Sequence, residues 1–258
     1  MLIDTHAHIY LDNFDDDIDQ IIKRSMDADV RKILLPNIDV SSINRVHNLC
    51  ESFPEICFPM MGLHPCSVHE GYESELAKIH ENILSNHYIA IGEIGLDYYW
   101  DKTKIDIQKN AFIIQLEWAR TFNLPIVIHS RDSIDDILDI LENEENIPTG
   151  VFHCFTGSLK QAQRIMDLGY YMGIGGVLTF KNSGLDQIVV DIPLSYLILE
   201  TDSPYLTPTP HRGKRNESSY VKFIAEKLAQ IKSVNLETIK NITTQNAENL
   251  FELKSISD

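Results

Sequence analysis

Short apolar runs alternate with longer segments in which apolar residues recur every three or four positions. Runs of the first kind predict buried strands, and the periodic segments predict amphipathic helices. The expected strands are Met1–Ile3, Lys32–Pro36, Ile56–Gly62, Tyr88–Glu93, Pro125–His129, Gly150–His153, Tyr170–Ile174 and Tyr196–Glu200. The expected helices are Phe14–Asp29, Ser41–Ser52, Tyr72–Ser85, Ile105–Phe122, Ile134–Leu141, Leu159–Leu168, Leu185–Val190, Ser218–Ile231 and Leu236–Leu250.

Regular alternation of strand and helix predicts parallel strands joined by helical crossovers. Eight such units in a chain of 258 residues favour a (β/α)₈ TIM barrel. An open doubly wound sheet is the alternative, but it usually has fewer strands. No linker or low-complexity segment interrupts the pattern, so residues 1–258 are expected to form a single domain.

Composition limits the classes of protein to consider. No apolar run approaches the roughly 20 residues that span a bilayer. An acid at Asp4 and the lack of an early basic region argue against a signal peptide, so we expect a cytoplasmic protein. Cysteines lack CxxC spacing and are expected to be free and mostly buried; they are Cys50, Cys57, Cys66 and Cys154. The net charge of −16 argues against broad electrostatic binding of nucleic acid, but a metal and a few local cations can still hold a phosphate.

Polar residues with metal-binding side chains follow or close six of the expected strands. They are His6, His8, His64, Glu93, His129, His153 and Asp202. In a barrel these strand ends meet at the carboxyl-terminal face, where barrel enzymes hold their active sites. His6 and His8 also point to the same side of their strand, because side chains alternate. The sequence therefore predicts a metal centre in the barrel mouth.

Ligand types indicate how this centre is built. A carboxylate can bridge two ions, and Glu93 is central in strand order. His6, His8 and Asp202 could complete one site, and His129 with His153 the other. Two divalent ions would stabilise both the attacking and the leaving oxygen of a displacement. Imidazole ligands favour zinc, manganese or iron over magnesium. Asp202 is also a candidate general base on a metal-bound water.

Six blocks of sequence resemble the signature of the TatD family of metal-dependent deoxyribonucleases. They are Asp4-Thr5-His6-Ala7-His8, Gly62-Leu63-His64-Pro65, Gly92-Glu93-Ile94-Gly95-Leu96-Asp97-Tyr98-Tyr99, His129-Ser130-Arg131, His153-Cys154-Phe155-Thr156-Gly157 and Glu200-Thr201-Asp202-Ser203-Pro204-Tyr205-Leu206. The resemblance runs in order through the whole chain. It implies a metal-dependent hydrolase that cleaves phosphodiester bonds, with 3′-to-5′ exonuclease activity on single-stranded DNA.

The resemblance also implies roles for individual residues. The metal ligands are His6, His8, Glu93, His129, His153 and Asp202, with Glu93 and Asp202 as the catalytic carboxylates. His64 is placed near the substrate phosphate. Family assays generally use magnesium, whereas the histidines favour a softer ion, so we expect two divalent ions and leave magnesium, manganese and zinc open.

Further candidates lie near the expected strand ends. Arg212, Lys214 and Arg215 form a basic cluster in an acidic chain and are predicted to bind phosphate, the alternative being a solvated loop. The family usually has Pro where this chain has Ser218. Arg131 is a further substrate-binding candidate; it could face the site or a neighbouring carboxylate.

The aromatic run Tyr98-Tyr99-Trp100 could stack an unpaired base, although loop packing is slightly favoured. Asp97 and Glu200 are expected to orient ligating histidines.

Two other functions stay open. The chain could be an amidohydrolase-type enzyme acting on an amide, lactone or nucleobase, although Glu93 stands where many such barrels carry a carboxylated lysine. It could also be a non-catalytic barrel that binds a partner and keeps a structural metal, but a full ligand set with a candidate base disfavours this.

Overall fold

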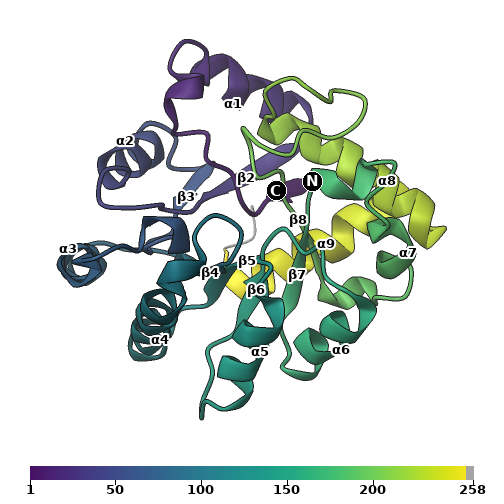
Figure 1. The fold of residues 1–258 in the computed structure, drawn as a ribbon. Helices are drawn as coiled ribbons and strands as arrows, with labels where there is room; N and C mark the ends of the chain where they lie inside the picture. Colours follow the sequence, from purple (N-terminus) through teal and green to yellow (C-terminus); the bar gives the residue numbers. More distant parts are fainter. Residues whose placement is uncertain (254–258) are drawn as a thin grey trace.

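The computed structural model describes residues 1–253, with parallel strands at the centre and helices around them (Figure 1). The strands are β1 Leu2–Asp4, β2 Val30–Leu35, β3 Cys57–Pro59, β4 Ile91–Asp97, β5 Ile126–Arg131, β6 Gly150–Phe152, β7 Tyr171–Ile174 and β8 Leu197–Leu199. The α-helices are α1 Ile18–Asp27, α2 Ile43–Ser52, α3 Tyr72–Ser85, α4 Ile105–Phe122, α5 Ile134–Glu142, α6 Leu159–Asp167, α7 Leu185–Val189, α8 Val221–Lys232 and α9 Leu236–Phe251. Short 3₁₀ helices are η1 Asp12–Phe14, η2 Pro65–Ser67, η3 Lys102–Lys104, η4 Gly176–Thr179, η5 Leu194–Tyr196 and η6 Ser218–Tyr220.

The strands form two parallel sheets in the order β1-β2-β3 and β4-β5-β6-β7-β8. Isolated parallel bridges connect the sheets at both ends. One joins Met61, which follows β3, to Ile91 of β4, and the other joins Ala7 to Ser203, which follow β1 and β8. Each strand end therefore lies beside the end of the next strand in this order. Residues that are far apart in the sequence come close together in this way.

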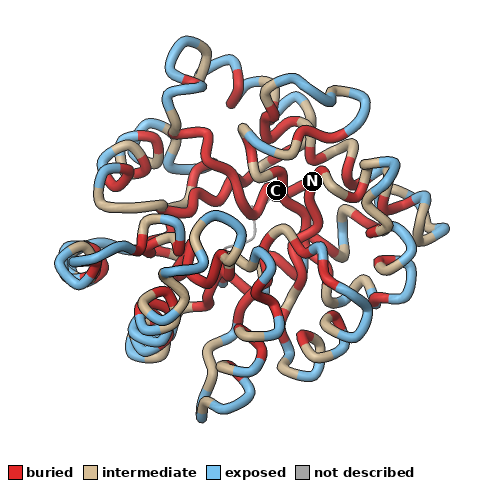
Figure 2. The backbone as a smooth tube through the Cα atoms, viewed as in Figure 1, coloured by how far each residue is buried: buried red, intermediate tan, exposed pale blue. Residues whose placement is uncertain are grey.

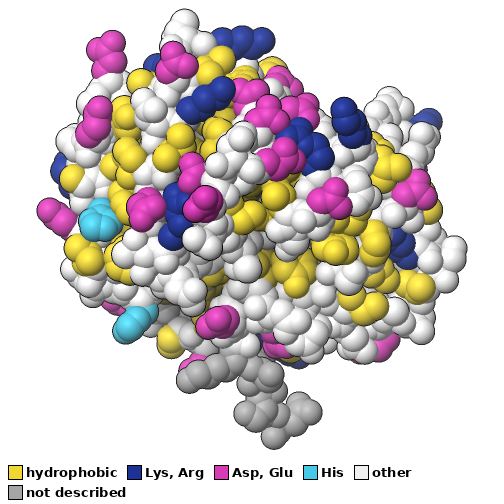
Figure 3. All heavy atoms as spheres, turned by 90° about the horizontal axis from the view of Figure 1, so that it is seen from below, with side chains coloured by type: hydrophobic (Ala, Val, Ile, Leu, Met, Phe, Trp, Pro, Cys, Tyr) yellow, Lys and Arg dark blue, Asp and Glu magenta, His cyan; other side chains and the backbone are white. Residues whose placement is uncertain are grey.

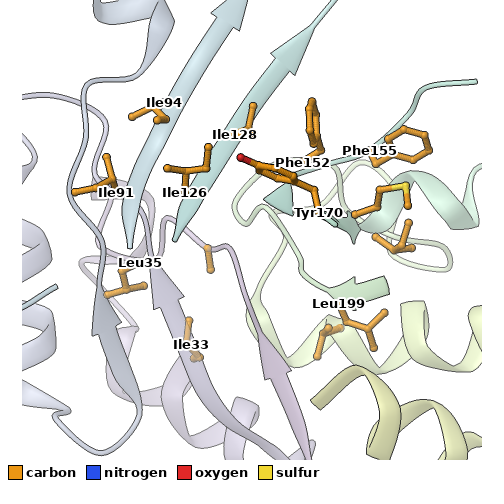
Figure 4. Close-up of a cluster of buried hydrophobic side chains, with 14 of the residues drawn as sticks. Ile33, Leu35, Ile91, Ile94, Ile126, Ile128, Phe152, Phe155, Tyr170 and Leu199 are labelled. Atoms are coloured by element: carbon orange, nitrogen blue, oxygen red, sulfur yellow. The ribbon is translucent and has the colours of Figure 1, made fainter. Parts of the chain in front are cut away.

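Apolar side chains pack in two layers. The larger cluster lies between the strands and the surrounding helices, and Figure 4 shows part of it, including Ile94, Ile128 and Phe152. The smaller cluster combines strand residues such as Leu34, Val127 and Ile198 with Leu250 and Phe251 of α9. Buried segments accordingly fill the centre in Figure 2, and exposed ones lie on the outer faces of the helices. Helix α9 packs against β8 and β1.

Most predicted elements are confirmed, and the helices Tyr72–Ser85 and Ile105–Phe122 match at both ends. The expected end of the fourth strand at Glu93 is wrong, because β4 continues to Asp97. Gly95 weakens the strand pattern in the sequence, because glycine is uncommon inside strands. In the structure, however, Gly95 pairs with His129 of β5. A side chain there would clash, since an added Cβ would lie 2.1 Å from the His129 carbonyl oxygen.

The expected helices from Phe14 and Ser218 begin later, at Ile18 and Val221, because 3₁₀ turns occupy the preceding residues. All four cysteines are free, as predicted, but the expectation that most are buried is wrong. Cys57 is buried, Cys66 is exposed, and the other two are intermediate.

Charged side chains of both signs are interspersed on the side of the molecule seen in Figure 3. Among the helices of the described residues, none combines the length and apolar character needed to cross a membrane.

Two buried glutamines on α4 hold strand ends in place. Gln115 accepts a hydrogen bond from the Leu63 amide at 2.7 Å and donates to the Leu63 carbonyl at 3.2 Å. Gln108 does the same for Asp97, at 2.9 and 3.2 Å. Both glutamines therefore satisfy buried backbone groups beside the predicted metal centre, where an unpaired group would cost free energy.

We predict that Gln108→Leu and Gln115→Leu each lower the free energy of unfolding by about 1–3 kcal/mol, because each leaves one backbone donor and one acceptor buried without partners. Urea unfolding followed by circular dichroism measures the change. Gln163→Leu is the control, since Gln163 bonds only Asp167 on the exposed side of α6 and should change stability by less than about 0.5 kcal/mol. Losses no larger than this control would contradict the role of the two buried glutamines.

Candidate metal centre

The candidate centre draws its side chains from five strands. His6 and His8 follow β1, Glu93 lies within β4, His129 lies within β5, and His153 directly follows β6. Asp202 follows β8, in the left-handed region with φ of 56°. Its amide donates to the His6 carbonyl at 2.9 Å, and the His8 amide donates to the Ser203 carbonyl at 2.7 Å. These backbone bonds align the ends of β1 and β8 and fix the Asp202 conformation.

Glu93 stands between two groups of imidazoles. Its Oε2 lies 3.1 Å from His6 Nε2 and 3.5 Å from His8 Nε2. Its Oε1 lies 2.8 Å from His129 Nδ1 and 3.2 Å from His153 Nε2. Each carboxylate oxygen thus faces one pair of rings, the arrangement expected of a carboxylate that bridges two ions.

Asp202 closes the group on its other side. Its Oδ1 lies 3.6 Å from His8 Nε2 and 3.9 Å from His6 Nε2. The structure therefore brings together all six predicted ligands. Three overlapping sets offer closely spaced ligand atoms, namely His6, His153 and Asp202; His6, His8 and Glu93; and His64, Glu93 and His129.

The proton position on His8 follows from its neighbour Tyr10. The buried Tyr10 hydroxyl donates to the Pro36 carbonyl at 2.6 Å. The same oxygen lies 2.8 Å from His8 Nδ1, so it accepts the proton of that nitrogen. In a neutral imidazole the other nitrogen then carries a lone pair. His8 therefore presents an unprotonated Nε2 to Glu93 and Asp202.

Carboxylates fix two further rings in the same way. Glu200 Oε1 lies 3.2 Å from His153 Nδ1, and Asp97 Oδ2 lies 2.9 Å from His129 Nε2. An ionised carboxylate only accepts, so each ring donates its proton outward. The expectation that Asp97 and Glu200 orient these histidines is confirmed. In the neutral form that binds a metal, the inner nitrogens, His153 Nε2 and His129 Nδ1, then carry lone pairs directed at Glu93.

This donor set fits divalent cations. In their neutral forms, His8, His129 and His153 direct lone pairs at the carboxylate of Glu93, which is 2% exposed. The lone pairs and the carboxylate are all negative, so their close approach in a buried site is favourable only with a positive charge between them. Burial alone would raise the pKa of Glu93, but the neighbouring imidazoles of His64, His153 and His6 lower it well below its ordinary value, so the carboxylate is ionised. Burial also lowers the pKa of His6, which favours the neutral ring that a ligand needs.

His64 differs from the other histidines. Its Nδ1 accepts a hydrogen bond from the Cys66 amide at 3.0 Å, so its neutral ring carries the proton on Nε2. That Nε2 points at Glu93 Oε1 from 3.3 Å. His64 is thus a donor at the edge of the centre rather than a source of a lone pair, which agrees with a position beside a substrate.

The centre is partly open where three of its side chains are partly exposed. His6 is fully buried, whereas Asp202 is 14% exposed, His64 14% and His129 16%. A substrate can therefore reach the centre between these three side chains.

Several residues that support the metal centre are not predicted from the sequence. Tyr10 lies in the turn that follows His8, so no strand or helix period in the sequence indicated its contact with His8. Asp4 accepts from the Thr201 amide at 2.8 Å and from its hydroxyl at 2.6 Å, which ties β1 to the end of β8. Burial raises the Asp4 pKa to about 7 despite these bonds. Glycine at 173 leaves room for Glu200, because an added Cβ would lie 2.1 Å from its Oε2.

The three cations predicted to bind substrate in the segment after β8 differ in their contacts. Arg215 makes a bidentate pair with Asp17, at 2.9 and 2.7 Å, so its charge is already compensated. Arg212 stacks on Phe180 at 3.6 Å and lines a cavity of about 570 Å³. Lys214 is exposed. Phosphate binding by the three stays a prediction.

Arg131 lies over the Tyr99 ring, with Cζ 3.6 Å from the ring centre, and its cavity is also lined by Asp132, Asp135 and Asp136. Substrate binding by Arg131 stays a prediction.

Comparison with known proteins agrees with this centre. The family model described as TatD related DNase matches residues 3–252. The chain belongs to the TatD family. It is 42% identical over 255 residues to the Bacillus subtilis uncharacterized metal-dependent hydrolase YabD, covering 98% of this chain and all of that protein. It is 34% identical to the metal-dependent hydrolase YcfH of Escherichia coli K12, covering 98% and 96%.

A solved relative has the same fold. The crystal structure of YjjV, a TatD homologue from E. coli K12, superposes with a TM-score of 0.92 at 28% identity and covers 98% of each chain. This TatD-family chain is therefore a metal-dependent hydrolase with the α/β fold of its relatives. Its converging ligand atoms support the use of divalent metal.

We predict that Tyr10→Phe weakens metal binding about 10- to 100-fold, because His8 loses the acceptor that keeps its proton on Nδ1. Titration of metal against a competing chelator measures the affinity. Tyr88→Phe is the control, since Tyr88 hydrogen-bonds His47 at 2.7 Å away from the centre and should leave the affinity unchanged. Equal affinities of the two variants would show that Tyr10 does not orient His8.

Proposed function

We propose that this TatD-family hydrolase cleaves phosphodiester bonds of DNA, as a 3′-to-5′ exodeoxyribonuclease on single strands. The observation that carries the proposal is the carboxylate of Glu93 between two pairs of imidazoles, with Asp202 beside it. Two divalent cations held by these residues would stabilise both the attacking and the leaving oxygen of an in-line displacement at phosphorus.

We also propose that the two sheets act as one (β/α)₈ barrel, closed by the bridges Met61–Ile91 and Ala7–Ser203. Parallel strands place their carboxyl ends on one face. Four of the proposed ligands follow the carboxyl ends of their strands, and Glu93 and His129 lie within β4 and β5. The centre would then occupy the mouth of the barrel, and α9 the opposite end.

The proposed ligands are His6, His8 and Asp202 for one cation and His129 with His153 for the other, bridged by Glu93. Magnesium, manganese and zinc are the candidate ions. When bound, they would supply Lewis acidity to a phosphoryl oxygen and a lowered pKa to water. Burial raises the pKa of Asp202 to about 6, and its exposure on the open side lets its carboxylate take a proton from the attacking water.

Other side chains would position the substrate. His64 Nε2 carries a proton and can donate it in a hydrogen bond to a phosphoryl oxygen, which fixes the reacting phosphate next to Glu93. Arg212 and Lys214 would attract the following phosphates in spite of the net charge of −16. Because positive charge is local, binding depends on the centre more than on the surface.

We predict that purified protein shortens a 5′-labelled single-stranded oligonucleotide from its 3′ end with magnesium or manganese and stops in excess EDTA. Glu93→Gln should lower the rate by more than about 100-fold, beyond the effect of residues that merely orient metal ligands, because it removes the bridging charge. Glu145→Gln, at an exposed position outside the centre, is the control and should keep full activity.

The assay also distinguishes other substrates. Folded, metal-loaded protein that leaves DNA intact with both ions would exclude the nuclease. Hydrolysis of a panel of amides, lactones and nucleobases by that same protein would then identify an amidohydrolase-type activity.

A further inference from the structure

An aromatic pair stands in solvent beside the centre. Trp100 is 71% exposed and Tyr99 54% exposed, although large aromatic rings usually bury most of their surface. The two rings meet edge to face, with centres 5.0 Å apart and planes at 89°. Arg131 covers one face of Tyr99 and lies 5.6 Å from the Trp100 ring centre. The expected loop packing is therefore wrong for these two residues; Tyr98 is half-buried and donates to Asp136 at 2.8 Å.

The pair is fixed relative to the centre by a single carboxylate. Asp97 Oδ2 accepts from the ring of His129, as described above. Its other oxygen, Oδ1, accepts from the backbone amides of Tyr99 at 2.9 Å and Trp100 at 3.3 Å. Arg131 follows His129 on β5, and its carbonyl accepts from the Tyr98 amide at 2.9 Å. The same residues that orient a proposed metal ligand thus hold the aromatic pair at the rim.

Charge beside the pair favours a neutral occupant. Arg131 borders a cavity of about 640 Å³ that Asp132, Asp135 and Asp136 also line. Asp136 pairs with Lys109, and Asp135 shares Arg164 with Asp139 and Glu142, so positive charge is not in excess around this cavity. Without an excess of positive charge, this place does not attract phosphate. Exposed rings and a flat guanidinium instead match an uncharged planar group.

We propose that Tyr99, Trp100 and Arg131 form a stacking platform for one unpaired nucleobase next to the scissile phosphate. The platform rests on the proposed nuclease function and deepens it, because only a base released from a duplex can stack there. It selects single strands through the π-face that every base offers, so it is tolerant of sequence.

A comparison of three single-stranded oligonucleotides tests the platform. One is unmodified, and the others are abasic at the terminal or at the penultimate 3′ nucleotide. Trp100→Ala should raise KM for the unmodified strand about 10- to 100-fold and leave kcat within about twofold. For one of the abasic strands the same substitution should change KM by less than about twofold, because the base that stacks is already missing. Equal effects on all three strands would overturn the platform.

A binding measurement separates the platform from catalysis. The chain has two tryptophans, so Trp118→Phe leaves Trp100 as the reporter and Trp100→Phe is the matched control. Metal-loaded Trp118→Phe protein is titrated with a phosphorothioate oligonucleotide that resists cleavage. Single strands should quench Trp100 fluorescence, and duplex should do so at least about tenfold more weakly. Quenching without any cleavage of normal DNA would reject the nuclease and keep a base-binding site. Absence of quenching would reject the platform and point to a protein partner for the exposed rings.

Discussion

The structure of the centre depends on the burial of one ionised carboxylate among imidazoles whose protons face outward. Glu93 is nearly inaccessible to water, and His8, His129 and His153 direct lone pairs toward it. Such an arrangement is unfavourable without positive charge, which bound cations would supply. The outward partners make this possible, because Tyr10, Asp97 and Glu200 each fix which nitrogen of a ring is protonated.

The backbone supplies the precision that this arrangement needs. Short strand ends carry the ligands, and each end is secured by a bond to a distant part of the chain. Asp4 joins β1 to the residues after β8, and Gln115 and Gln108 hold the residues after β3 and at the end of β4. Each of these three side chains is buried and makes two hydrogen bonds to the segment that it holds. These bonds limit the movement of the ligands. Such fixed placement lets electrostatic stabilisation act without reorganisation during the reaction.

In the proposed function, substrate recognition is divided between the centre and its rim. Phosphate would interact with the centre, where His64 offers a proton and the cations would lie. An unpaired base would interact with the rings of Tyr99 and Trp100, which share Asp97 with the centre. This division would let an acidic protein act on a polyanion: attraction would be confined to a few positions, while the face seen in Figure 3 carries charges of both signs.

Sequence alone determined the alternation of strands and helices and the six converging ligands, because hydrophobic period and strand-end placement are local signals. It also identified Asp97 and Glu200 as partners of the histidines. It misjudged the end of β4, since Gly95 weakens the strand pattern while pairing with His129 makes the strand continue. Tertiary structure alone decided the tautomers, the ion pair that engages Arg215 and the exposure of Trp100. These depend on contacts between residues distant in sequence, whose energies no local pattern records.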